Sequence, residues 1–168
     1  MEKLIILDRR IARDSWQLVT EGAGLPLPGD AIVPLAIWRE SRAHLAARAG
    51  RTGVWRRPDD EPADLAGDIA RLPLVAVQFP QFTDGRGYST ARLLRERYGF
   101  AGELRAIGEV LRDQLFYLER VGFNAFDLKE GKSLEDALLA FGDFSDAYQS
   151  SVKRPLPHYR RRPAGADA

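Results

Sequence analysis

The segment Leu74–Phe79 (LVAVQF) constrains the fold of this chain more than any other. It is almost continuously apolar and rich in β-branched residues. This composition is typical of a strand that is buried on both faces of a parallel sheet. Parallel strands need crossover connections, which are usually helical, so strands and helices should alternate along the rest of the chain.

Strand and helix patterns do alternate on both sides of this segment. Short apolar runs predict further strands at Ala31–Leu35, Gly53–Arg56, Glu103–Ile107 and Ala125–Leu128. Helices are predicted between and after them, at Ile37–Ala49, Ala63–Leu72, Ser89–Tyr98, Glu109–Val121 and from Ser133 to about Phe141. Ser133 is the expected N-cap of the last helix, and Ser89 is expected at the N-cap or in the first turn of its own.

The pattern predicts an α/β fold whose mostly parallel sheet has about five strands, with flanking helices. Five strands are too few to close an eight-stranded barrel, so we expect an open sheet. A partial (half) TIM-like barrel is the alternative.

The two ends of the chain differ from this alternating region. The charged turn Asp8–Arg10 lies between short strand patterns and predicts an N-terminal β-hairpin of Leu4–Leu7 with either Ile11–Ala12 or Trp16–Val19. After Ser150 the sequence is rich in Pro and Arg. We therefore predict a single domain over residues 1–150 and a flexible basic tail over residues 151–168.

Composition excludes several classes of function. Hydrophobic residues make up 45% of the 168 residues and charged residues 29%, which is enough for a core and a solvated surface. The 25 basic residues nearly balance the 24 acidic ones, and this balance argues against a nucleic-acid-binding protein. No apolar run approaches the roughly 20 residues that span a bilayer, so we predict no membrane association. The N-terminal apolar run is too short for a signal peptide, and the expected location is the cytoplasm.

The sequence contains no cysteine and only two histidines, His44 and His158. Disulfides, thiolate nucleophiles and Cys-ligated zinc or iron–sulfur clusters are therefore excluded. The two histidines lie far apart in the sequence, and no local motif surrounds them. We predict no metal site and no cofactor.

The loop that follows Leu74–Phe79 is the first candidate site, because ligands in parallel α/β folds bind beyond the carboxyl ends of the strands. Asp84 and Arg86 place opposite charges beside two glycines, just before a predicted helix whose free amide groups attract anions. Further hydroxyl and guanidinium groups follow at Thr83, Tyr88, Ser89 and Arg92. The loop predicts an anion or small-ligand site. The alternatives are a helix-capping loop in which Asp84 and Arg86 hold each other, and a protein-docking surface.

The end of the next strand offers a second set of side chains. Arg105 lies within the predicted strand Glu103–Ile107, and the following helix begins with Arg112, Asp113 and Gln114. A buried arginine needs a partner, since an unpaired buried charge is costly. Asp84 and Asp113 are the natural partners, and they are also the weak candidates for acid–base catalysis. The alternative is an internal ion pair that fixes the packing of two neighbouring βα units.

The two sets together predict one site. We expect five side chains to converge around a single concavity, namely Asp84, Arg86, Tyr88, Arg105 and Asp113.

The run FPQFTDGRGYSTARLLRERYGFAGELRAIGEVLRDQLFYLERVGFNAFDL (Phe79–Leu128) resembles a family of bacterial proteins of unknown function. Its most specific parts are FTDGRGYS, ARLLRERYG and LRDQ, and the resemblance extends loosely to the segment around Asp14–Trp16 and to the acidic turn Pro58–Glu61. Members are labelled oxidoreductases involved in sulfite reduction, because their genes lie beside the gene for assimilatory sulfite reductase.

The resemblance implies an accessory protein of assimilatory sulfite reduction, without its own redox centre because the chain has no cysteine. It implies sulfite reductase as a partner, docked through the arginine-rich face and tail, or a small anion held by Arg86, Ser89 and Arg92. The alternative is an enzyme or ligand-binding module for a small anionic or phosphorylated metabolite, with Asp84 or Asp113 as acid–base group. Whether the protein is an enzyme is left open at this point.

Overall fold

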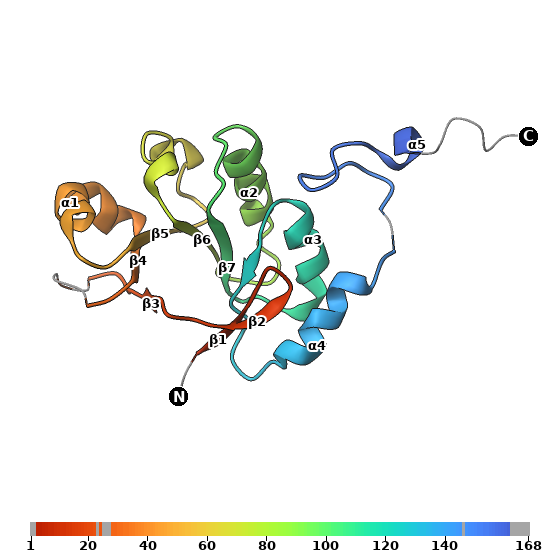
Figure 1. Cartoon of the computed structure of the whole chain (residues 1–168), viewed down its shortest axis with the longest axis horizontal. Coiled ribbons are helices and arrows are strands. Elements are labelled where there is room, and N and C mark those ends of the chain that lie inside the picture. The colour runs from red at the N-terminus through yellow and green to blue at the C-terminus, as the bar shows by residue number, and fades with distance from the viewer. Residues whose placement is uncertain (1–2, 23, 25–27, 146, 162–168) are drawn as a thin grey trace, which may run out of the picture.

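Eight strands form one mixed sheet in the computed structural model, which describes residues 3–22, 24, 28–145 and 147–161. The strand order is β2-β1-β8-β7-β6-β5-β4-β3. Their bounds are β1 Leu4–Leu7, β2 Arg10–Arg13, β3 Gln17–Leu18, β4 Ala31–Pro34, β5 Thr52–Arg56, β6 Leu74–Phe79, β7 Glu103–Gly108 and β8 Ala125–Phe126. Strands β3 to β8 are parallel and adjacent in chain order, whereas β1 pairs antiparallel with both β8 and β2. The sheet curls into a half-barrel (Figure 1).

The structure therefore fits the half-barrel alternative, and the expected mostly parallel sheet of about five strands is wrong. The N-terminal hairpin is confirmed, but it belongs to the sheet because Ile6 and Leu7 pair with Phe126 and Ala125 of β8. The hairpin partner is the alternative that contains Ile11–Ala12, whereas the Trp16–Val19 pattern contains β3, which pairs parallel with β4 at the other edge of the sheet.

The first two main helices begin two or three residues earlier than predicted, and the later ones are shorter than predicted. The helices are α1 Leu35–Ala47, α2 Arg86–Glu96, α3 Leu115–Arg120, α4 Leu134–Leu139 and α5 His158–Arg161, with 3₁₀ turns η1 Pro62–Leu65, η2 Ile69–Arg71, η3 Arg112–Gln114 and η4 Ala140–Gly142. The helix predicted over Ala63–Leu72 is wrong, since two 3₁₀ turns on either side of Gly67 replace it. Ser133 does cap α4, accepting a 3.0 Å hydrogen bond from Asp136 N. In α2 the N-cap is Gly85, and Ser89 lies near the end of the first turn.

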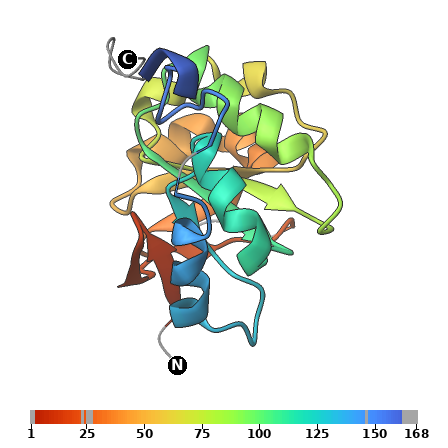
Figure 2. The same ribbon diagram turned by 90° about the vertical axis from the view of Figure 1, so that its right-hand side faces the viewer.

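Helices cover the outer face of the half-barrel. Alternate strand residues such as Val54, Val77 and Ala106 point to this face and pack with Trp38 of α1 and Leu94 of α2 in the main core. Figure 2 shows α2, α3 and α4 in succession on the side of the molecule toward the viewer.

A smaller apolar cluster lies on the concave face. Its members are Ile32, Trp55, Leu74, Ala76 and Ile107, with Trp16 packed against them. Trp16 belongs to the segment that leaves β2 at one edge of the sheet and reaches β3 at the other, crossing the concave face (Figure 1). Trp55 Nε1 donates a 2.8 Å hydrogen bond to Val19 O just beyond this crossing.

The C-terminal residues return to α3. Val152 N donates to Arg120 O (3.0 Å), Lys153 Nζ donates to Glu119 Oε1 (2.7 Å), and His158 N donates to Tyr148 O (3.1 Å). Residues 151–161 of the predicted tail thus contact α3 and their own neighbours, whereas residues 162–168 lie outside the described residues. In the described part of the chain, no helix combines the length and the apolar character that crossing a membrane requires.

Candidate functional site

Asp84 and Arg86 pair with each other in the loop after β6. Arg86 Nη2 lies 2.7 Å from Asp84 Oδ2 and Arg86 Nε lies 3.0 Å from Oδ1, while the Arg86 backbone N donates to the same carboxylate (3.2 Å). The side-chain hydrogen bonds lower the pKa of Asp84 and raise the pKa of Arg86. This is the mutual pairing of the helix-capping alternative. Thr83 and Ser89 on either side are exposed.

Close packing on Phe79 fixes the start of α2. A Cβ atom on Gly87 would lie 2.5 Å from the tip of the Phe79 ring, so only glycine fits there without a shift. The next residue, Tyr88, packs edge-on against Phe79, with ring centroids 5.7 Å apart. The loop sequence Gly-Arg-Gly-Tyr therefore places the first turn of α2 directly over the end of β6.

Tyr88 and Gln114 join the two predicted strand-end loops. The Gln114 side chain hydrogen-bonds the Tyr88 hydroxyl, and burial raises the pKa of Tyr88 above its ordinary value. Gln114 is itself buried, accepting from Leu111 N (2.9 Å) and donating to Phe82 O (3.4 Å). These two predicted site residues do come together, through neutral hydrogen bonds.

Arg112 and Asp113 point elsewhere. Arg112 forms a two-point contact with Asp143, with both N···O distances at 3.0 Å. The side chain of Asp113 is 78% exposed and lies 3.9 Å from Arg112 Nη1.

The partner predicted for Arg105 is wrong. Arg105 is 2% exposed and pairs with Asp14 (2.9 Å) and Glu103 (2.7 Å), not with Asp84 or Asp113. Its neighbours in the strand, Leu104 and Ala106, belong to the outer core, so Arg105 faces the concave side. The segment that crosses this side brings Asp14 to it.

The expected convergence of five side chains around one concavity is therefore wrong. Arg105 lies on the concave face of the sheet, while Arg86 begins α2 and Asp113 lies in η3, just before α3. Two other predicted residues, Tyr88 and Arg92, line a cleft that sequence reasoning did not anticipate.

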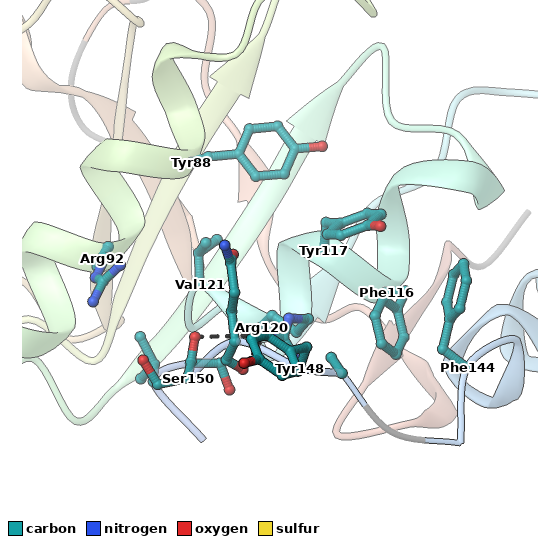
Figure 3. A pocket seen from close by; sticks show the side chains of 13 residues that line it. Tyr88, Arg92, Phe116, Tyr117, Arg120, Val121, Phe144, Tyr148 and Ser150 are labelled. Carbon is teal, nitrogen blue, oxygen red and sulfur yellow. Dashed lines mark hydrogen bonds between the residues drawn. The ribbon is translucent and has the colours of Figure 1, made fainter. Parts of the chain in front are cut away.

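This cleft has a volume of about 540 Å³ and lies between α2, α3, Phe144 and residues 147–152 (Figure 3). Tyr88 and Arg92 line it from α2, and Phe116, Tyr117 and Arg120 line it from α3. We call it the aromatic cleft. Its far wall is the C-terminal segment, which had been predicted as a separate tail from residue 151 onward.

Exposed rings gather at one end of the aromatic cleft. The Phe116 ring lies 4.8 Å from that of Phe144 and 5.4 Å from that of Tyr117, centroid to centroid. Tyr117 and Phe144 are 54% and 53% exposed. A cluster of exposed aromatic side chains marks a surface suited to binding.

Two arginines supply positive charge to the same cleft. Arg120 Nη2 donates to Gln149 O (2.8 Å), and its guanidinium lies 5.8 Å from the centre of the Phe116 ring. Arg92 pairs with Glu96 (2.9 Å), and both side chains are exposed. Among the described residues that line the cleft, none is acidic. The arrangement suits an anion that also carries a planar or apolar group.

Arg56 is a further functional candidate that sequence reasoning missed. It ends β5 and is fully buried, and its Nε, Nη1 and Nη2 atoms have no hydrogen-bond partner among the residues that the structure describes. Burial lowers the pKa of Arg56, while four carboxylates further away, Asp59, Asp60, Glu61 and Asp64, act in the opposite direction. The sequence did contain a signal. Arg56 ends the predicted strand Gly53–Arg56, and an arginine in a buried strand needs a partner, as was argued for Arg105.

A second cavity, of about 450 Å³, lies at the carboxyl ends of the strands on the concave side. Trp55, Arg57, Gln78 and Ile107 contribute to its lining, and Arg57 pairs with Glu21. Over the described ranges, no group of three or more His, Asp or Glu side chains is arranged to hold a metal ion.

Comparison with known proteins gives one match. The model of a family described as bacterial protein of unknown function (DUF934) matches residues 53–159. This range contains all of β5 except its first residue, β6 to β8, Arg56 and every residue that lines the aromatic cleft. Searches of curated proteins and of solved structures found no match.

Proposed function

We propose that this chain, which belongs to the DUF934 family of bacterial proteins of unknown function, is an anion-binding accessory protein of sulfite reduction without a redox centre of its own. The link to sulfite reduction comes from the resemblance of the Phe79–Leu128 segment described above. The absence of cysteine supports a role outside electron transfer, since the chain has no thiol couple.

The aromatic cleft is the observation that carries the proposal. Arg92 and Arg120 offer guanidinium groups to an oxyanion, and the rings of Phe116 and Tyr117 offer faces to a planar group. Because no acidic residue lines the described cleft, its field favours an anion over a cation. Its volume of about 540 Å³ falls within the range of small-molecule sites. The ligand in this proposal is an anion larger than sulfite, with a planar part.

Isothermal titration calorimetry with phenyl phosphate, inorganic phosphate and sulfite tests the binding. We expect phenyl phosphate to bind most tightly, because only this probe can use both the arginines and the rings. Replacing Arg120 or Arg92 by Met should weaken its binding roughly 10- to 100-fold, the loss of a hydrogen bond to a charged group.

The matched control is Arg97→Met. Arg97 is an exposed arginine at the end of the same helix, outside the cleft. This variant should bind phenyl phosphate as the wild type does. Equal binding by the Arg120 and Arg97 variants, or no binding of any of the three anions, would contradict the proposed cleft site.

Growth of a deletion strain tests the pathway separately. A strain without the gene should grow poorly when sulfate is the sulfur source and normally when cysteine is supplied. Normal growth on sulfate would argue strongly against a role in sulfite reduction, while leaving the alternative of a ligand-binding module for another anionic or phosphorylated metabolite.

A second candidate function is docking of sulfite reductase itself. The exposed rings of Tyr117 and Phe144 favour it, because exposed aromatic residues are enriched in protein interfaces. Salt-sensitive capture of the reductase by the wild type, lost in a Phe144→Ala variant that still binds phenyl phosphate, would favour docking over ligand binding.

A further inference from the structure

The cavity of about 450 Å³ on the concave side of the half-barrel, which we call the concave cavity, plays no part in the proposed function. Its lining comes from four parallel strands, β3, β5, β6 and β7. Every described lining residue lies in the last two positions of one of these strands or within the three residues that follow. Ligands of parallel α/β folds bind at this end of the strands. The concave cavity therefore has the volume and the position of a small-molecule site.

Buried apolar side chains form the floor of the concave cavity. Trp55 and Ile107 belong to the concave cluster and are 8% and 3% exposed. Val19 is buried beside them, and its carbonyl oxygen accepts the 2.8 Å hydrogen bond from Trp55 Nε1. A guest with an apolar group would displace water from this floor, which is favourable.

Gln78 brings a side-chain amide to the same cavity. Ala76, two residues earlier in β6, belongs to the concave cluster, so Gln78 also points to the concave side. The Gln78 side chain is partly buried and has no hydrogen-bond partner among the residues that the structure describes. An amide donates two hydrogen bonds and accepts two. It therefore offers both functions to a guest.

Arg57 and Glu21 supply the charges of the concave cavity, and they pair with each other. Their side chains are 49% and 47% exposed. An exposed ion pair contributes little to stability, because water competes for both groups. A guest can therefore separate the two side chains at little cost if it satisfies both of them. The other described lining residues are uncharged, so the net charge of this lining is zero.

From these observations we infer that the concave cavity binds a free α-amino acid with an apolar side chain. Because Arg57 and Glu21 are in direct contact, the opposite charges of the guest must also lie close together, as they do around the α-carbon of an amino acid. Its carboxylate would accept hydrogen bonds from Arg57, and its ammonium group would donate to Glu21. Gln78 can hydrogen-bond either group. A simple anion or cation satisfies one member of the pair and leaves the other without a partner.

NMR titration of the isotope-labelled full chain, followed through the tryptophan indole signals, tests the inference. L-leucine should shift the signal of Trp55 and leave that of Trp38, which belongs to the outer core, in place. Three analogues each lack one feature of the probe: N-acetyl-leucine lacks the ammonium group, leucinamide lacks the carboxylate, and glycine lacks the apolar side chain. Each should bind at least roughly 10-fold more weakly than leucine.

Two substitutions test the two charges separately. Arg57→Met should weaken leucine binding roughly 10- to 100-fold and should remove the preference for leucine over leucinamide. Glu21→Gln should remove the preference for leucine over N-acetyl-leucine. Both side chains are about half exposed, so both variants should fold.

The matched control is again Arg97→Met, which should bind leucine as the wild type does, because Arg97 lies outside the concave cavity. The Arg57 and Glu21 variants should bind phenyl phosphate normally, since the aromatic cleft is a separate site and either site can fail without the other. Equal binding of leucine and its three analogues, no shift of Trp55 with any of them, or an Arg57 variant that keeps its preference for leucine over leucinamide would overturn the inference.

Discussion

Two buried arginines on neighbouring regions of the sheet show opposite solutions to the same problem. Arg105 has two carboxylates in direct contact, whereas Arg56 has none. A buried ion pair contributes little net stability, yet removing one of its members leaves an uncompensated charge. Replacing Arg105 should therefore destabilise the protein, whereas replacing Arg56 removes a buried charge without a partner and should not.

Arg105→Met should destabilise the protein by about 3–5 kcal/mol, because Asp14 would remain buried without its partner. Urea denaturation measures the change. The matched control is Arg92→Met, which breaks the exposed pair with Glu96 and should cost no more than about 0.5 kcal/mol. Equal stability of the Arg105 variant and the wild type would show that the Asp14 carboxylate is satisfied in another way.

At the residue scale, the sequence shows that a buried side chain needs a partner more readily than it shows which residue that partner is. The need of Arg105 for a carboxylate follows from its place in a strand, and the structure supplies one. Its identity could not be predicted, because Asp14 lies 91 positions away in the chain and reaches Arg105 only through the segment that crosses the concave face. The pairing of Asp84 with Arg86 was available because the two residues are neighbours in sequence.

At the scale of elements, Glu119 connects three parts of the chain. This residue of α3 accepts hydrogen bonds from Arg9 in the β1–β2 turn (2.6 and 2.8 Å) and from Lys153 in the C-terminal segment (2.7 Å). Burial acts to raise the pKa of Glu119, but the hydrogen bonds from Arg9 and Lys153 lower it, and the net shift is downward. The carboxylate is thus more stable in the folded chain than in the unfolded one.

This shift predicts a pH dependence. A depressed folded pKa stabilises the protein above the unfolded pKa of about 4.3, and the contribution disappears as pH falls through the folded value. At pH 7, Glu119→Gln should be less stable than the wild type by about 1–3 kcal/mol. The difference should shrink steadily below about pH 4. Urea denaturation at pH 7 and at several acidic pH values measures it.

Glu109→Gln is the control for this titration. Glu109 pairs with Lys129 on the surface, where both side chains are more than 40% exposed. Its substitution should change stability by less than about 1 kcal/mol at either pH. If the difference in the free energy of unfolding between the wild type and Glu119→Gln stayed constant at all acidic pH values, the titration of Glu119 would not be the cause of the pH dependence.

Elements were predictable where a local signal was strong. The apolar run Leu74–Phe79 coincides with β6, and the serine before α4 forms the expected cap. The structure of the region 57–73 could not be predicted from its sequence pattern. Its helix-forming residues follow Pro62 and lie on both sides of Gly67, and they form two 3₁₀ turns instead of an α-helix. The two residues of β3 are both exposed, so the backbone pairing with β4, and not side-chain burial, defines this strand.

At the scale of the whole molecule, the order of strands explains the curl. Strands β3 to β8 follow one another in both chain and sheet, as in a barrel, in contrast to the reversed order of a doubly wound sheet. The sequence predicted the alternation of strands and helices but not the strand order. The pattern of a βα unit is the same whether the next strand is added on one side of it in the sheet or on the other. The position of the C-terminal segment against α3 was also hidden, since contacts such as Val152 N to Arg120 O and Arg120 Nη2 to Gln149 O use backbone groups of the segment.

A chain that ends at Asp143 tests this division of the molecule. The buried core ends at Phe141, so the half-barrel should still fold, with native tryptophan fluorescence. It should melt at a lower temperature, because the hydrogen bonds of Val152 with Arg120 and of Lys153 with Glu119 are lost. The aromatic cleft would lack its C-terminal wall, so phenyl phosphate binding should disappear in calorimetry. An unfolded product would place the segment 144–161 within the folding unit, and undiminished phenyl phosphate binding would place the anion site outside the cleft.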